Sequence, residues 1–221
     1  KDNTKAILQQ IKDNFTVELS EQGMQEGKNY LSLKVAQKLT HDFLKLEVQL
    51  LQEALTENKQ IKIVGKEEEL KYSLKLDGVD FNLIGKADRV DFEGDTLRII
   101  DYKTGKVEDS EVMFTEYDEI IDNPKKAKAF QLLMYAYLYL KMNPQYIDID
   151  VVVGIFSFKN LKSGLIKVSE KISSKEKQVI KIDTNAIEGF QQQLEIVLTK
   201  IINDDFEQVS DLKACEWCDY K

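Results

Sequence analysis

The stretch Gly85-Lys86-Ala87-Asp88-Arg89-Val90-Asp91 is followed shortly by Asp101-Tyr102-Lys103-Thr104-Gly105. The two segments combine an acid, Asp88, with a second acid and a lysine that are separated by a single residue, Asp101 and Lys103. Two carboxylates can share a divalent cation such as Mg²⁺, which prefers oxygen ligands. A lysine beside them can orient water or stabilise developing charge. These residues therefore predict a candidate metal site.

The residues around this stretch have the alternating pattern of β-strands. Apolar and polar residues alternate from Gln60 to Leu76, which is the strand period. Asp77-Gly78 is a hairpin turn signal, and Glu93-Gly94 is a second one. The pattern predicts antiparallel strands over residues 61–76, 79–92 and 97–103.

The register of the second hairpin decides whether the acids meet. If Glu93-Gly94 is the centre of an even-length turn, Asp88 and Asp101 are diagonal neighbours on one face, about 7–8 Å apart. Lys103 then lies on the same face. A three-residue turn would break this parity. The alternative is that these residues are solvent-facing charges on an ordinary hairpin.

Other segments complete a mixed architecture. Helical periodicity predicts helices over residues 1–16, 30–57, 124–141 and 184–202, and short apolar runs predict strands over 149–158 and 165–168. We predict an α/β fold, a mixed sheet with an antiparallel meander flanked by helices. The chain is interpreted as a single domain over residues 1–221, with a helical N-terminal part (1–58) and a core (59–221).

Composition limits the possible functions. The net charge is −8, whereas a free-standing nucleic-acid-binding module is usually basic. No apolar run approaches the roughly 20 residues that span a bilayer, so no membrane partner is expected. The only cysteines are the close pair Cys215 and Cys218, which favours a reducing cytoplasm. The chain does not begin with Met, and we expect it to be a fragment of a larger protein.

Three ordered motifs resemble a known family. Gly85-x-x-Asp88-Arg89-x-Asp91, then Ile100-Asp101-Tyr102-Lys103-Thr104-Gly105, then Gln131-x-x-x-Tyr135 resemble the RecB-like branch of the PD-(D/E)XK nuclease superfamily. That branch includes the nuclease domains of RecB and AddB-type helicase–nucleases. The resemblance covers residues 61–221 and implies a restriction-endonuclease-like core.

The resemblance also implies roles for individual residues. Asp88 and Asp101 would be the metal-binding acids for Mg²⁺ or Mn²⁺, and Lys103 the catalytic lysine. Gln131 and Tyr135, one helical turn apart, would contact DNA or brace the site. The alternative for these two is ordinary packing of an aromatic-rich helix.

Three further features fit the family pattern only in part. Glu67 matches a frequent family acid, although it begins a charged run that can simply be solvated. Family members carry a metal-binding His in a G-x-x-x-H context, but no glycine precedes His41 at that offset, so we expect the true motif upstream of Lys1. Cys215 and Cys218 resemble part of the AddB-type [4Fe–4S] site, which needs four thiolates, so a cluster is expected only in the full-length protein.

The function implied is metal-dependent hydrolysis of DNA phosphodiesters, expected to be exonucleolytic, in DNA repair or recombination. A helicase domain or subunit would feed the strand, because this chain has no Walker motif. One alternative is a catalytically inactive nuclease-fold module that binds DNA or protein. Another is an unrelated metal-dependent hydrolase of small phosphoesters.

Overall fold

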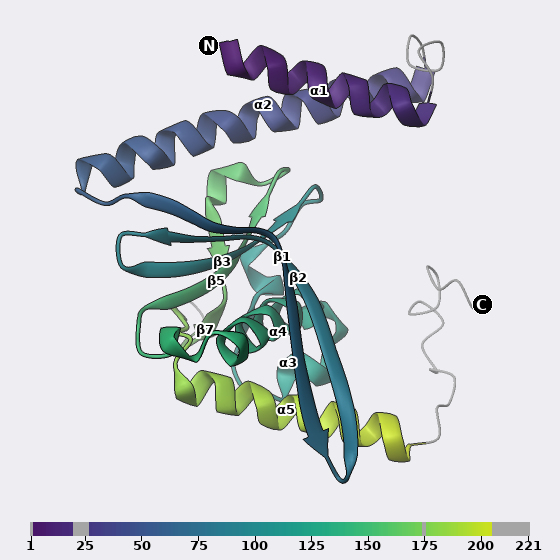
Figure 1. Ribbon diagram of the computed structural model, residues 1–221, viewed down its shortest axis with the longest axis vertical. Helices are drawn as coiled ribbons and strands as arrows, with labels where there is room; N and C mark the ends of the chain where they lie inside the picture. Colours follow the sequence, from purple (N-terminus) through teal and green to yellow (C-terminus); the bar gives the residue numbers. More distant parts are fainter. Residues whose placement is uncertain (1, 20–26, 174–175, 205–221) are drawn as a thin grey trace.

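The computed structural model describes residues 2–19, 27–173 and 176–204 of the 221-residue chain. A central sheet separates two helical layers (Figure 1). The helices are α1 (Asp2–Leu19), α2 (Gly27–Thr56), α3 (Glu119–Asp122), α4 (Ala127–Met142) and α5 (Thr184–Asn203). The strands are β1 (Ile61–Leu76), β2 (Val79–Glu93), β3 (Thr96–Lys103), β4 (Met113–Phe114), β5 (Val151–Ser157), β6 (Leu165–Lys167), β7 (Ser169–Lys171) and β8 (Lys177–Val179).

The main sheet mixes antiparallel and parallel pairs. Its strand order is β1-β2-β3-β5-β6. The first three strands form the predicted antiparallel meander, β3 pairs with β5 in parallel, and β5 pairs with β6 antiparallel. Helix α4 lies in the connection from β3 to β5, as parallel pairs require. The predicted α/β fold with a mixed sheet and flanking helices is confirmed, and it is consistent with a restriction-endonuclease-like fold.

The two hairpin turns differ in how well the sequence predicted them. Asp77 and Gly78 have φ of 49° and 82° and join β1 to β2, as expected for a two-residue turn. In the second hairpin, Glu93 pairs with Thr96, so the turn is Gly94-Asp95 and not Glu93-Gly94. The predicted register was therefore wrong by two residues. The parity is unchanged, because a shift of two keeps every side chain on its face.

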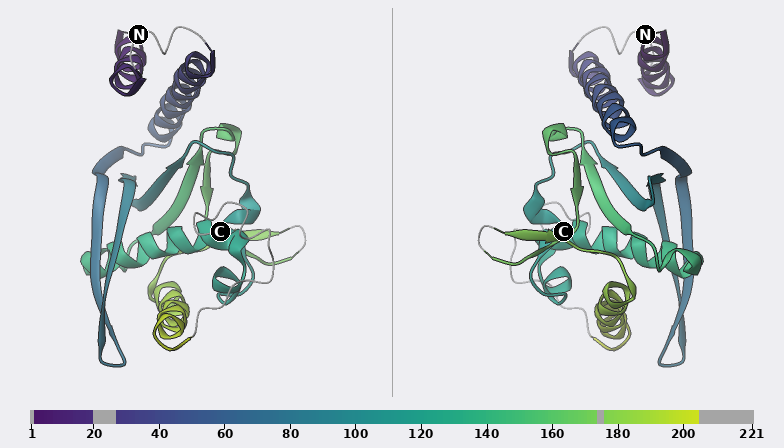
Figure 2. Two further views of the ribbon diagram at one scale, coloured as in Figure 1. Left: turned by 90° about the vertical axis from the view of Figure 1, so that its right-hand side faces the viewer. Right: turned by 90° about the vertical axis from the view of Figure 1, so that its left-hand side faces the viewer.

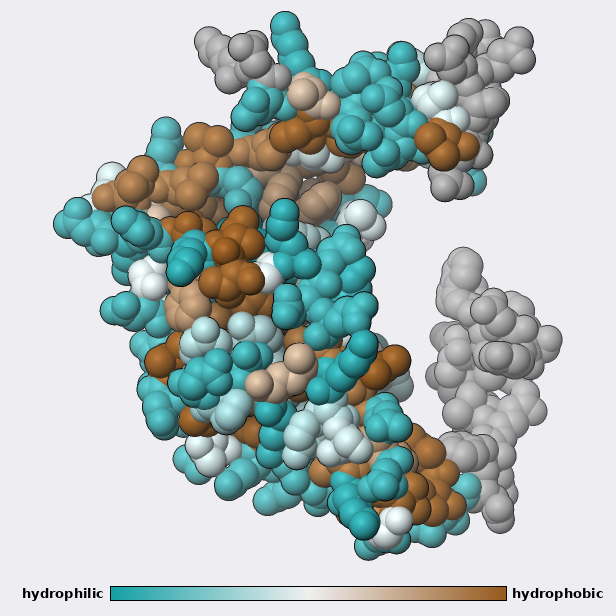
Figure 3. Space-filling model, in the orientation of Figure 1, coloured by the Kyte–Doolittle hydropathy of each residue, from teal (hydrophilic) through white to brown (hydrophobic). Residues whose placement is uncertain are grey.

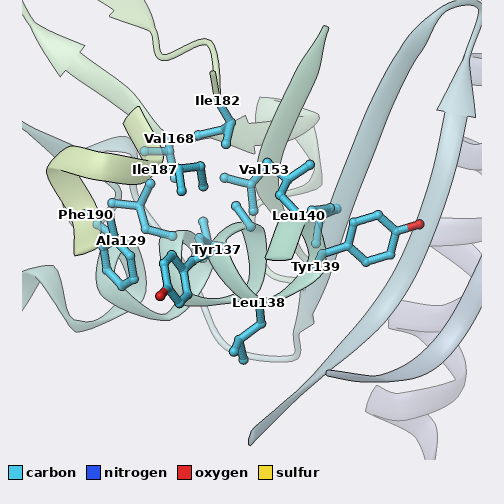
Figure 4. Close-up of a cluster of buried hydrophobic side chains, with 14 of the residues drawn as sticks. Ala129, Tyr137, Leu138, Tyr139, Leu140, Val153, Val168, Ile182, Ile187 and Phe190 are labelled. Atoms are coloured by element: carbon cyan, nitrogen blue, oxygen red, sulfur yellow. The ribbon is translucent and has the colours of Figure 1, made fainter. Parts of the chain in front are cut away.

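The hydrophobic core lies between the sheet and the pair of helices α4 and α5. Figure 2 shows α4 crossing one side of the sheet with α5 beyond it. Helix α4 is buried on most sides, and Tyr137 and Leu138 are fully inaccessible to solvent. Figure 4 shows Tyr137 beside Phe190 of α5, with ring centroids 5.9 Å apart, and Leu138 on another side of α4. Each such side chain contributes about 1.5–3 kcal/mol by leaving water, so this core fixes α4 against the sheet.

Helix α2 covers the other face through aromatic side chains. The ring of Phe43 lies 5.3 Å from the ring of Tyr102 on β3 and 5.8 Å from that of Phe156 on β5. Beyond α2, helix α1 is attached by a hydrogen bond from Gln37 Nε2 to the carbonyl of Leu8, 3.2 Å long. The molecule is thus layered as α1, α2, sheet, α4 and α5 (Figures 1 and 2).

Part of α2 keeps apolar side chains at the surface. Val48, Leu51 and Leu55 are 54%, 43% and 67% exposed, and Ile63 of β1 is 50% exposed. In Figure 3 apolar side chains gather along α2 and the neighbouring end of the sheet. None of the helices in the described ranges is both long enough and apolar enough to cross a membrane.

Candidate active site

The two predicted metal acids lie on adjacent strands at the end of the second hairpin. The paired register of β2 and β3 ends with Arg89 and Ile100, so Asp88 and Asp101 are the next residues along the two strands. This register differs by two residues from the predicted one, in which Asp88 faced Ile99. One oxygen of the Asp88 carboxylate, Oδ2, accepts a hydrogen bond of 2.7 Å from the backbone N–H of Tyr102. The backbone after Asp101 therefore holds the side chain of Asp88.

Asp101 is the more buried acid of the pair. It is 3% exposed, and the ammonium of Lys103 lies 3.2 Å from Oδ1 and 3.0 Å from Oδ2. Burial raises the pKa of the Asp101 carboxyl, Lys103 opposes the rise, and the charge of Asp88 adds to it. Oδ2 of Asp101 is buried without a hydrogen bond of acceptable geometry, despite the nearby ammonium. The pair therefore has a surplus of negative charge that a cation would neutralise.

The sheet is irregular at Asp88. Ala87 and Val90 both belong to the buried core, although residues three apart on a regular strand point to opposite faces. On β1, Lys66 and Glu68 pair with Arg89 and Ala87, so Glu67 is the residue beside Asp88. Glu67 has φ of 50°, which costs a residue with a Cβ about 1–2 kcal/mol. Strain and irregular strands are concentrated at functional sites, so this position is consistent with a site.

Glu67 itself is directed to solvent and is ion-paired with Lys86. Its side chain is 73% exposed. It nevertheless lines an open cleft of about 780 Å³ together with Asp88 and Tyr102. The same cleft is bordered by Lys66 and Arg89, so it offers charged groups of both signs beside Asp88.

Helix α4 brings the third motif to the acids. The Gln131 side-chain amide donates a 2.7 Å hydrogen bond to Tyr135 Oη and lies 3.4 Å from Asp101 Oδ1. The helix can approach because Gly85 has no side chain: a Cβ there would lie 3.3 Å from the ring of Tyr135 and 3.1 Å from Leu138. The three motifs seen in the sequence therefore meet in space, and the glycine of the first motif makes room for the third.

The donor set fits a hard divalent cation. Carboxylate oxygens suit Mg²⁺ or Mn²⁺, and a buried Asp101 oxygen without a hydrogen bond is available to such an ion. Within the ranges that the structure describes, no group of three or more His, Cys, Asp or Glu side chains could hold a metal. The protein would thus supply Asp88 and Asp101, with water completing the shell.

Two weaker candidates from the sequence remain, His41 and the cysteine pair. His41 lies on α2 and is no part of a ligand group with Asp88 and Asp101 in the described part of the chain. Its Nδ1 is buried without a hydrogen-bond partner. Cys215 and Cys218 lie outside the described residues.

The structure adds residues that sequence reasoning did not assign to the site. Glu47 of α2 accepts a 2.9 Å hydrogen bond from Arg89, and Phe43 packs on Tyr102. Both helix residues touch the positions next to the acids. The only sequence signal was their i, i+4 spacing on one face of the helix, which also fits ordinary packing.

A comparison with protein families identifies the class. The model of the PD-(D/E)XK nuclease superfamily matches residues 2–221, so the chain belongs to this superfamily. Membership indicates a nuclease, an enzyme that hydrolyses phosphodiesters.

Other comparisons add little to this assignment. No curated protein matches the sequence. Among solved structures, the crystal structure of SSO0001 is similar at 12% sequence identity with a TM-score of 0.33, covering 94% of this chain and 76% of that one. The superposition is too loose to transfer either fold detail or function.

Proposed function

We propose that this chain is a RecB-like DNA nuclease domain that hydrolyses phosphodiesters with Mg²⁺ or Mn²⁺. The observation that supports this most is the juxtaposition of Asp88, Asp101 and Lys103, with Gln131 reaching the same carboxylate from α4. Scattered surface charges would not bury an acid to 3% exposure beside a second one. The arrangement favours a site over the solvent-facing alternative.

Each residue has a role in this proposal. Asp88 and Asp101 would hold the cation, which when bound would lower the pKa of a water and neutralise charge on the phosphate. Lys103, whose side chain is 30% exposed, can reach both Asp101 and the water that attacks. Gln131 and Tyr135 keep the Asp101 carboxylate oriented and provide polar groups for the DNA strand.

The wider setting is part of the same proposal. The domain would act as an exonuclease in cytoplasmic DNA repair or recombination, as part of a longer protein or beside a helicase subunit that delivers the strand. The net charge of −8 favours such delivery, because the chain alone attracts DNA poorly. Cys215 and Cys218 would serve a [4Fe–4S] cluster only with two further thiolates.

The experiment is a cleavage assay of the full chain with Mn²⁺ on linear and circular DNA, single- and double-stranded. We expect Mn²⁺-dependent cleavage of linear DNA that Asp101→Ala abolishes. Asp80→Asn is a control, since Asp80 is an exposed acid at the far end of β2, where it pairs with Lys75 of β1. Cleavage of circular DNA would replace the exonuclease by an endonuclease, and cleavage that survives Asp101→Ala would refute the assignment.

A second candidate is an inactive module that retains the nuclease fold. The shortage of metal ligands in the described residues favours it. It predicts DNA or protein binding without cleavage and without any dependence on Mn²⁺. Binding of Mn²⁺ that Asp101→Ala removes would argue against it.

A further inference from the structure

Helix α2 reaches the site through a buried ion pair. The Arg89 side chain is 8% exposed, and its Nη1 donates to Glu47 of α2 at 2.9 Å. Nε of Arg89 lies 2.5 Å from Asp91 Oδ2, without hydrogen-bond geometry. A buried charge that loses its partner costs several kcal/mol. The side chains of Arg89 and Glu47 are therefore expected to keep their contact in the folded protein. Glu47 and Arg89 thus join the helix to the strand residue that follows Asp88.

The same arginine also holds the neighbouring strand. Nη1 of Arg89 lies 3.3 Å from the hydroxyl of Tyr102, and that ring is packed edge-on against Phe43 of α2 at 5.3 Å. Tyr102 is the residue between Asp101 and Lys103. Its side chain is therefore fixed at both ends, and it lines the same cleft as Asp88.

Tyr102 passes this constraint to the acids through its backbone. Its N–H donates to Asp88 Oδ2 at 2.7 Å, while its chain neighbours carry the other acid and the lysine. Moving the ring of Tyr102 would shift this N–H, and with it the direction of the Asp88 carboxylate. The path from Glu47 through Arg89 and Tyr102 to Asp88 consists of direct contacts.

We propose that Glu47, Arg89 and the Tyr102 hydroxyl form a brace that positions Asp88 against Asp101 for the metal ion. In this proposal the three are positioning residues, since their side chains act on the metal ion only through the carboxylate of Asp88. Helix α2 thus contributes a brace to the site. The inference rests on the proposed function, because it assumes that the acid pair binds a divalent cation.

The chemistry of the brace makes the arginine hard to replace. A guanidinium presents several donors in one plane and can hold Glu47 and Tyr102 at once, whereas an ammonium is a single compact charge. Partners of metal ligands, when removed, weaken metal affinity by roughly 10–100-fold. A defect in the brace should therefore appear in metal affinity before it appears in folding.

The test measures Mn²⁺ binding by the full chain, by calorimetry or by electron paramagnetic resonance, well below the melting temperature. We expect Arg89→Lys and Glu47→Gln to raise the Kd for Mn²⁺ roughly 10-fold. Tyr102→Phe, which removes one hydroxyl and keeps the ring, should raise it about 3-fold. The last variant loses only the 3.3 Å contact of one hydroxyl, so it keeps the test decisive if the first two are unstable.

Arg98→Lys is the matched control. Arg98 is similarly buried, and its hydrogen bonds and ion pairs in the described residues are with Glu93 and with Asp91, which it shares with Arg89, and not with Glu47 or Tyr102. Its replacement should lower the melting temperature and leave the Kd within about 2-fold, as expected of a merely structural ion pair.

The outcomes separate the brace from the function on which it rests. If wild-type protein binds Mn²⁺ and Asp101→Ala abolishes binding, while the three brace variants bind like wild type, the brace is refuted alone. If Arg98→Lys weakens binding as much as Arg89→Lys, general loosening explains the effect and the brace is again refuted. If wild type binds no Mn²⁺, the proposed function fails and the brace fails with it.

Discussion

The two faces of the β2–β3 hairpin bury charge in opposite ways. On the α2 face, Asp91 is fully buried between Arg89 and Arg98, and each acid there has an opposite partner. On the α4 face, Asp101 is buried beside the like charge of Asp88, and Lys103 offsets part of this charge.

This difference suggests that the charges on one face stabilise the fold and that those on the other face serve cleavage. On the α2 face each acid lies beside an arginine of opposite charge, whereas on the α4 face burial and a like charge raise the pKa of Asp101. Groups with perturbed pKa values and incomplete pairing gather where ligands bind. Substitutions on the two faces should therefore affect different properties, and four predictions test this.

The largest effect is expected for Asp101→Asn. Loss of a metal ligand removes several kcal/mol of transition-state stabilisation, so cleavage should fall about 10³-fold or more.

The free energy of unfolding should not fall in the same variant. Because the pKa of Asp101 is raised in the folded state, the folded protein holds this proton more tightly than the unfolded chain, and ionisation above about pH 4 costs stability. A melting temperature in metal-free buffer at pH 7 equal to or above wild type confirms this, and a large decrease contradicts it.

On the other face, Asp91→Asn should mainly destabilise the fold. It leaves two buried arginines short of a counter-charge, which costs about 3–5 kcal/mol. The melting temperature should drop by roughly 6–20 °C at this size. Asp95→Asn in the exposed turn is the control and should stay within about 0.5 kcal/mol. An unchanged melting temperature for Asp91→Asn would show that this ion-pair cluster is not structural.

Gly85→Ala should affect both properties to a moderate degree. The new Cβ would meet the Tyr135 ring at 3.3 Å and Leu138 at 3.1 Å, so α4 or the ring must shift. Overpacking of this kind costs about 1–3 kcal/mol, and we expect roughly 10-fold slower cleavage as Gln131 moves with the helix. Thermal melting and a cleavage assay measure the two effects.

Gly105→Ala is the control for that substitution. Gly105 has no atom within 4 Å of an added Cβ and no positive φ, so its replacement should leave the melting temperature unchanged or slightly higher. If Gly85→Ala behaves like Gly105→Ala, the close approach of α4 does not depend on the glycine.

Local patterns predicted most of this fold, because alternation, helical periodicity and turn residues are properties of neighbouring residues. The strands β1 to β3 and the helices α4 and α5 followed from such patterns. The register of the second hairpin did not, because Glu93-Gly94 and Gly94-Asp95 are both acceptable turns and cross-strand pairing decides between them.

The site was predictable only where motif residues carry it. Asp88, Asp101 and Lys103 were found in the sequence, and their adjacency follows from an even-length turn. The contact of Glu47 with Arg89 joins residues far apart in the chain, and no local pattern records which face of α2 meets which strand. The contact of Gln131 on α4 with Asp101 likewise joins residues that are 30 positions apart.

Tyr135→Phe is expected to have the smallest effect. It tests whether the hydroxyl of Tyr135 on α4 contributes to cleavage. The variant keeps the ring against Gly85 and removes only the hydroxyl that accepts the 2.7 Å hydrogen bond from Gln131. Stability should change by about 1 kcal/mol or less. Gln131, freed from this acceptor, would hold Asp101 less firmly, so cleavage should slow by about 3-fold.

Tyr137→Phe is the control on the same helix, since its hydroxyl contacts Gln191 at 3.4 Å, away from the acids. If both variants cleave DNA at the wild-type rate, the third motif serves packing, and the chemical face consists of the two acids and Lys103.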